Sequence, residues 1–100
     1  MPMDRRANMV RLAPADNIAV ALSDIAAGET ALDRAQLMVT VRERIPQGHK
    51  IALQPIAADE PIIRFGMPVG LAKVAIAKGA LVHIHNVRSQ YLDNEVDHYE

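Results

Sequence analysis

Two short segments of this sequence carry side chains that could do chemistry, and His49 and Lys50 form the first. They are adjacent and directly follow the turn residues Pro46-Gln47-Gly48. Imidazole is a general base near neutral pH, and an ammonium group can neutralise an anionic substrate as a point charge. His49 and Lys50 are therefore the candidate catalytic pair, placed at the base of a short strand that follows the turn.

The second segment is His83-x-His85-Asn86. Alternate residues of a strand share one face about 7 Å apart, so these two imidazoles could hold one metal ion. The alternative is two polar residues on the wet face of a half-buried strand. Asn86 has two similar interpretations, since its amide either caps the strand or binds a substrate oxygen. A metal ion needs three or four protein ligands, and His49 or Asp16 could supply a further one.

Arg64 adds a guanidinium fork that suits a carboxylate. For Lys50 and Arg64 alike, the alternative is a solvated surface charge. The sequence contains no nucleophile elbow, no phosphate-binding glycine loop and no dinucleotide fingerprint. Cysteine is absent, which excludes disulfides and thiolate sites. We therefore do not expect this chain to catalyse a reaction alone.

Composition restricts the class of protein further. One hundred residues predict a single domain with a modest core, so a sizeable active site needs a partner. The 11 basic and 12 acidic residues give a net charge of −1, and only three aromatic residues occur, which argues against nucleic acid. There is no signal peptide and no long apolar stretch, so we expect a cytoplasmic protein that does not enter a membrane.

An internal duplication must position these residues. The segments 20–29 and 51–60 are identical at six positions. The shift that carries residue 20 onto residue 51, which we call the repeat offset, also superimposes residues 45–48 on 76–79. A Gly or Asp stands at each turn, where a positive φ is expected. Two copies at this period predict two interlocked halves.

The predicted elements are short strands separated by turn residues, which indicates a small all-β domain. Ile18, Val20 and Leu22 are expected on one face of a strand, and Val82 and Ile84 are expected to point inward. Residues 61–65 are interpreted as the counterpart of residues 37–41. The predicted strands are residues 9–12, 18–22, 37–41, 51–53, 61–65 and 82–85, with 69–74 as a strand or a turn.

We assign the domain to residues 1–88 and a polar acidic tail to residues 89–100. The tail is interpreted either as a frayed, solvated end or as an arm that orders against a partner. In the second case, Tyr91, Leu92 and Tyr99 are its anchors.

Four separated motifs resemble the SAF-type N-terminal domain of the altronate and galactarate dehydratase family. They also resemble the separate small subunit of its relative, sulfolactate sulfo-lyase. The resemblance covers residues 11–91, and galactarate-type members do not keep the last motif. The motifs are Asp16-Asn17-Ile18-Ala19-Val20-Ala21-Leu22, Gly48-His49-Lys50-Ile51-Ala52-Leu53, Ile63-Arg64-Phe65-Gly66-x-x-Val69-Gly70 and His83-x-His85-Asn86.

The resemblance implies a β-clip fold, a small bent all-β domain with two similar halves. It also implies a two-part lyase in which a larger chain supplies most of the pocket and Fe²⁺ or Mn²⁺ takes part. Members eliminate water, or sulfite in the sulfo-lyase, from hydroxy acids. By the motifs, His49 and Lys50 belong at the pocket, and His83, His85 and Asn86 are metal or substrate contacts. We assign His83 and His85 to the metal, and Asn86 together with Arg64 to the substrate.

Three functions stay open at this point. The first is the small subunit or N-terminal domain of an altronate dehydratase-like lyase, which is inactive alone and acts on a small anionic hydroxy acid with a larger catalytic subunit. The second is the small subunit of a sulfolactate sulfo-lyase. The third is a non-catalytic SAF-type binding module. Exposed strand edges are also consistent with pairing to a second copy of the chain.

Overall fold

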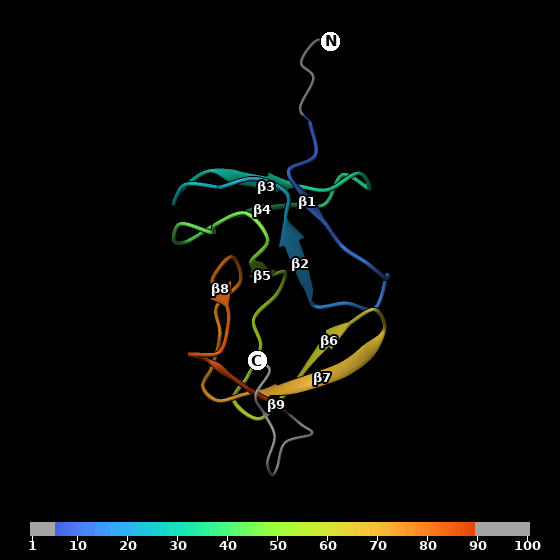
Figure 1. Cartoon of the computed structure of the whole chain (residues 1–100), viewed down its shortest axis with the longest axis vertical. Helices are drawn as coiled ribbons and strands as arrows, with labels where there is room; N and C mark the ends of the chain where they lie inside the picture. The colour runs from blue at the N-terminus through green and yellow to red at the C-terminus, as the bar shows by residue number, and fades with distance from the viewer. Residues whose placement is uncertain (1–5, 90–100) are drawn as a thin grey trace.

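Short antiparallel β-strands build the described part of the chain, residues 6–89, in this computed structural model, and this part contains no helix (Figure 1). The predicted all-β domain is therefore confirmed. The strands are β1 (Met9–Val10), β2 (Ile18–Ala21), β3 (Thr30–Leu32), β4 (Met38–Thr40), β5 (Lys50–Ala52), β6 (Pro61–Arg64), β7 (Met67–Ala72), β8 (Leu81–Val82) and β9 (Val87–Ser89).

The strands form three sheets that follow one another along the long axis. A four-stranded sheet of order β1-β2-β5-β8 occupies the middle. The β3–β4 hairpin lies at one end and the β6-β7-β9 sheet lies at the other (Figure 1). The central strands β2 and β5 pair antiparallel, with Ile18 opposite Ala52 and Ala19 opposite Ile51.

The predicted duplication recurs in the hydrogen bonds. Isolated bridges join Ile25 to Ile45 in the first half and Ile56 to Ile76 in the second, and the repeat offset relates both ends of the two bridges. The predicted positive φ angles are present too: 87° at Gly28 and 70° at the equivalent residue, Asp59. The two halves are therefore two copies of the same backbone unit.

Two asparagines attach the halves in equivalent ways. The Asn8 side chain binds β3 through the Thr30 carbonyl (3.1 Å) and the Leu32 N–H (2.7 Å). The Asn17 side chain binds β6 through the two groups that the repeat offset makes equivalent, namely the Pro61 carbonyl (3.0 Å) and the Ile63 N–H (2.8 Å). Asn8 and Asn17 themselves are not related by the repeat offset, so the sequence alignment of the halves does not reveal this relation.

β2 ends at Ala21, so Leu22 lies outside the predicted strand, and the face that begins with Ile18 is not uniformly buried. Leu22 is 48% exposed and Val20 is half-buried, whereas Ala19 and Ala21 are buried. The reason is that β2 lies between two hydrophobic clusters. Ile18 packs in the cluster of the second half, and Ala19 and Ala21 pack in the cluster of the first half, so both faces of β2 are covered.

The predicted strand 82–85 was also wrong beyond its first residue. β8 ends at Val82, residues 83–86 form a turn, and Ile84 is 61% exposed. The turn is closed by Asn86, whose backbone N–H donates to the His83 carbonyl (3.0 Å) and whose side-chain oxygen accepts the His83 N–H (2.9 Å). His83 and His85 therefore do not share the face of a strand.

The correspondence between strands of the two halves also differs from the prediction. Residues 61–65 correspond to the stretch that contains β3, which the sequence interpretation missed, and residues 37–41 correspond to residues 68–72 of β7. β9 was missed as well, and it pairs antiparallel with β7. Of the predicted tail, only Ser89 is described, and the predicted anchors Tyr91, Leu92 and Tyr99 lie outside the described residues.

Candidate functional site

A cleft of about 320 Å³ opens beside the central sheet, in the second half of the chain. Its two basic side chains are Lys50, at the start of β5, and His83, in the turn after β8. The rest of its lining is aliphatic: Ile18, Ile62, Val69, Val82, Ile84 and Val87. An apolar cleft with a few convergent polar groups is the usual form of a small-molecule site.

Lys50 is held in a half-buried position by strand pairing on both sides, with Val20 of β2 and Val82 of β8 as its partners. Burial, and after it the nearby positive charge of Arg64, lowers the pKa of Lys50. Both effects disfavour the ammonium form. A larger fraction of this amine is therefore neutral, and free to accept a proton, than in a solvated lysine.

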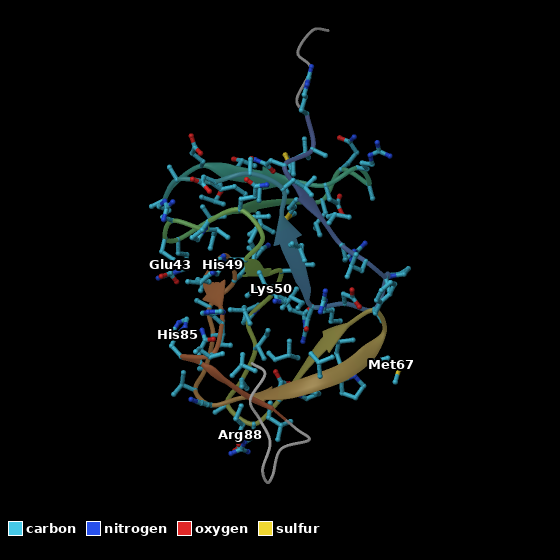
Figure 2. The ribbon with its side chains drawn as sticks, viewed as in Figure 1. Glu43, His49, Lys50, Met67, His85 and Arg88 are labelled. Atoms are coloured by element: carbon cyan, nitrogen blue, oxygen red, sulfur yellow. The ribbon has the colours of Figure 1, made fainter. Side chains whose placement is uncertain are left out.

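His49 and His83 are brought together from different strand ends. Their ring centroids are 4.9 Å apart and the rings are inclined at 58°. The Nδ1 atom of His49 is 3.5 Å from the Gln47 carbonyl, which is a weak contact. Figure 2 shows His85 apart from His49 and Lys50. The two imidazoles that lie next to each other in the structure are therefore those of His49 and His83.

The duplication provides an internal comparison for this cleft. By the repeat offset, Lys50 corresponds to Ala19 and His83 corresponds to Ala52. Both alanines are buried apolar residues, at 1% and 0% exposure. The fold therefore accepts a small apolar side chain at these positions. Folding alone does not require the basic side chains of Lys50 and His83.

The two predicted substrate contacts occupy different settings. Arg64 is exposed at the end of β6 and lies near enough to Lys50 to affect its pKa. Asn86 is buried, and its amide nitrogen donates to the Leu81 carbonyl (2.8 Å) while its oxygen accepts from His83. The structural role of Asn86 is confirmed, and its contact with substrate stays a prediction.

Residues 6–89 do not contain a complete metal site. No three His, Cys, Asp or Glu side chains in this range lie close enough together to hold one metal ion. His49 and His83 provide two neighbouring imidazoles, fewer than the three or four ligands that a divalent ion needs. Asp16, named above as a further ligand, instead accepts hydrogen bonds from the N–H groups of Phe65 and Gly66. The described residues fit only part of a ligand set.

Glu43 is a carboxylate near this region that the sequence interpretation missed. Its Oε2 atom accepts the Leu81 N–H (2.9 Å) at the edge of β8, and Figure 2 shows it on the side of the molecule where His49 and His85 lie. Glu43 stands between Arg42 and Arg44 in an ordinary charged stretch. No signal in the sequence distinguishes it.

The fold and the cleft define a class: a small duplicated all-β domain whose second half bears a basic, histidine-containing cleft. The sequence model of the altronate/galactarate dehydratase SAF domain matches residues 7–90. The chain therefore belongs to this family. No helix that could cross a membrane is present in residues 6–89.

Several curated relatives contain this domain. The chain is 39% identical over 92 residues to the altronate dehydratase of Escherichia coli (strain K12), covering 91% of this chain and 18% of that protein. It is 34% identical over 92 residues to the altronate dehydratase of Bacillus subtilis (strain 168), covering 92% and 18%. The chain thus spans about a fifth of the length of these relatives.

A relative of different organisation also matches. The chain is 37% identical over 54 residues to the (2R)-sulfolactate sulfo-lyase subunit alpha of Chromohalobacter salexigens, covering 54% of this chain and 57% of that subunit. The domain therefore occurs both as part of long chains and in a protein named as one subunit.

Proposed function

We propose that this chain completes the active site of a larger catalytic chain in an altronate dehydratase-like lyase, which eliminates water from a sugar acid. The observation that carries the proposal is the cleft, where Lys50 and His83 stand at the positions that the repeat offset aligns with the buried residues Ala19 and Ala52. Membership in the family and the small share of each altronate dehydratase that the chain covers support a two-part enzyme.

Elimination of water from a hydroxy acid requires three contributions. A base removes the proton next to the carboxylate, an acid or a metal assists the leaving hydroxyl, and cations stabilise the enolate-like charge. In the proposed roles, Lys50 and His49 act at the proton-transfer step, and Arg64 holds the substrate carboxylate. The lowered pKa of Lys50 supports its role as a base, because more of the amine is neutral than in an ordinary lysine.

The proposal retains an Fe²⁺ or Mn²⁺ ion shared with the larger chain. Such an ion would act as a Lewis acid on the substrate oxygen. Among the histidines of residues 6–89, His83 is the one best placed to contact it, because it lines the cleft and adjoins His49. His85 keeps its predicted metal role only if the larger chain brings the ion to the outer side of the 83–86 turn.

A second candidate is a sulfolactate sulfo-lyase, in which sulfite leaves instead of water. The observation that favours it is the match to a sulfo-lyase alpha subunit over 54 residues. Both substrates are anions of hydroxy acids, so the guanidinium of Arg64 suits either one. Turnover of altronate and of sulfolactate by the assembled enzyme, measured side by side, separates the two candidates.

The proposal is tested with His49→Ala and Lys50→Met in the assembled enzyme, with Lys78→Met as a surface control. Loss of a general base reduces turnover by about 10²- to 10⁴-fold. We expect such a loss for both variants, with unchanged assembly by size-exclusion chromatography and unchanged turnover for Lys78→Met. Wild-type turnover in both variants would contradict the proposed roles, and no turnover with any larger chain would favour the non-catalytic binding module.

A further inference from the structure

The tip of the β6–β7 hairpin, residues 64–67, displays large apolar side chains to solvent. Phe65 is 68% exposed and Met67 is 59% exposed. Figure 2 shows Met67 at the outer edge of the molecule, on the side opposite Glu43 and His85. Val69, two residues further along β7, is also exposed and lines the cleft that contains Lys50. The apolar tip is therefore continuous with one wall of the cleft.

The backbone of this tip is held by a buried carboxylate. Phe65 and Gly66 have positive φ angles of 60° and 74°. For a phenylalanine, this left-handed conformation is strained. Asp16 compensates by accepting the N–H groups of Phe65 (2.9 Å) and Gly66 (2.8 Å), and it also accepts the Ala13 N–H (3.0 Å). Phe65 is thus presented on a preorganised turn and not on a loose loop.

The first half contains the equivalent hairpin with a different tip. Its turn is also held by a buried carboxylate, because Asp33 accepts the N–H groups of Ala35 and Leu37, each at 2.9 Å. Yet the residues that the repeat offset aligns with Phe65 and Met67 are Arg34 and Gln36. A hairpin at the equivalent place therefore forms with a polar tip, although its positive φ falls at Gln36. The fold alone does not explain an aromatic residue and a methionine at this exposed place.

We propose that the β6–β7 tip docks into an apolar pocket of the larger lyase chain, with Phe65 as its anchor and Met67 beside it. This inference rests on the proposed function. The larger chain is the occupant that the observations favour, because the domain makes up only 18% of the altronate dehydratases it matches. The tip also adjoins the cleft through Val69, so a chain seated on the tip would cover Lys50 as well. Exposed, rigid aromatic anchors are typical of interface hot spots.

The test measures the affinity of this chain for the larger lyase chain, expressed separately, by isothermal titration calorimetry. We expect Phe65→Ser and Met67→Ser to raise the dissociation constant. Phe65→Ser should raise it at least about 10-fold. Met38→Ser is the matched control, because Met38 is 55% exposed and occupies the place of Val69 in the first half. We expect it to change the constant less than about 2-fold. All three side chains are exposed, so the variants should fold.

The outcomes separate this inference from the proposed function. If the wild-type complex forms and turns over substrate while Phe65→Ser and Met67→Ser bind as tightly as wild type, the docking inference is overturned and the lyase assignment stands. If wild type forms no active complex, the proposed function fails first. If the chain alone dimerises and Phe65→Ser abolishes the dimer, the tip belongs to a second copy and the inference is wrong.

Discussion

Lys50 shows how one side chain acquires unusual properties from an ordinary strand. Its neighbours in the sequence, His49 and Ile51, do not indicate burial of the amine. The half-buried position arises because β2 and β8 flank β5 on both sides and aliphatic residues line the adjoining cleft. The pKa of Lys50 is lowered first by that burial and then by Arg64, so the charged form is less stable in the folded chain than in the unfolded one.

This difference predicts how stability changes with pH. Between the lowered pKa and the ordinary value of 10.5, the unfolded chain binds more protons at Lys50 than the folded chain does, so the free energy of unfolding rises with pH. We expect Lys50→Met to remove this rise. Relative to wild type, the variant should therefore gain more stability at pH 7 than at pH 10. Urea unfolding at both pH values measures the difference, and an equal gain at both would contradict it.

Lys78→Met is the control for this experiment, because Lys78 lies on the surface. The variant removes one lysine from the surface and leaves Lys50 in place.

At the scale of the element, the turns of the duplicated unit depend on glycine for two separable reasons. Gly48 and Gly79 occupy equivalent positions, with φ angles of 85° and 87°. A Cβ atom at Gly48 would meet nothing within 4 Å, whereas one at Gly79 would collide with the Thr40 carbonyl oxygen. The carbonyl of Gly79 also accepts the Arg42 N–H (2.9 Å), which draws the second-half turn close to the end of β4.

The pair predicts a graded effect of alanine substitution. Gly48→Ala should destabilise the chain by about 1 to 2 kcal/mol, because only the left-handed conformation is strained. Gly79→Ala should cost at least about 1 kcal/mol more, because backbone atoms must also move apart. Urea unfolding at neutral pH gives both values. Equal losses in the free energy of unfolding would show that the collision with the Thr40 carbonyl is relieved without an energetic cost.

At the scale of the whole molecule, the two hydrophobic clusters share strands. Ala19 and Ile51 belong to the first cluster, while their chain neighbours Ile18 and Ala52 belong to the second. Consecutive residues of β2 and β5 therefore point into different clusters. Neither half can lose its cluster without disturbing strands that the other half needs.

This arrangement predicts one cooperative unfolding transition. Ile45 and Ile76 are equivalent buried residues in the two clusters, and each belongs to an isolated bridge. Substitution of either by alanine should cost about 2 to 5 kcal/mol. The single transition should persist in both variants, with coincident curves by circular dichroism and by NMR signals from both halves. A variant in which one half unfolds first would show that the clusters are independent.

Much of the architecture could be predicted because its signals are local. The repeat offset, the Gly or Asp at each turn and the β-branched runs are read directly from the chain, and the positive φ angles at Gly28 and Asp59 agree with them. The missed strand β3 carries only Thr30-Ala31-Leu32, which is too short and too rich in small residues to stand out. Its place follows from pairing with β4.

The candidate site was predicted less completely than the fold. His49, Lys50 and His83 were singled out by residue type and neighbouring turn signals, and the structure brings these three together. The pairing of His83 with His85 assumed a strand, which Asn86 prevents by closing a turn. Alternation of polar and apolar residues over four positions is too short a signal to distinguish these two cases.

The sequence by itself determined the duplicated all-β unit, the positions of its turns and the set of residues that could do chemistry, because repetition and turn residues act over a few neighbours. Only the tertiary structure decided that Lys50 is half-buried, that His83 approaches His49 and that Phe65 stands exposed on a clamped turn. These properties depend on which strands pair although they lie far apart in the chain, and on where Asp16 and Asn86 place their hydrogen bonds.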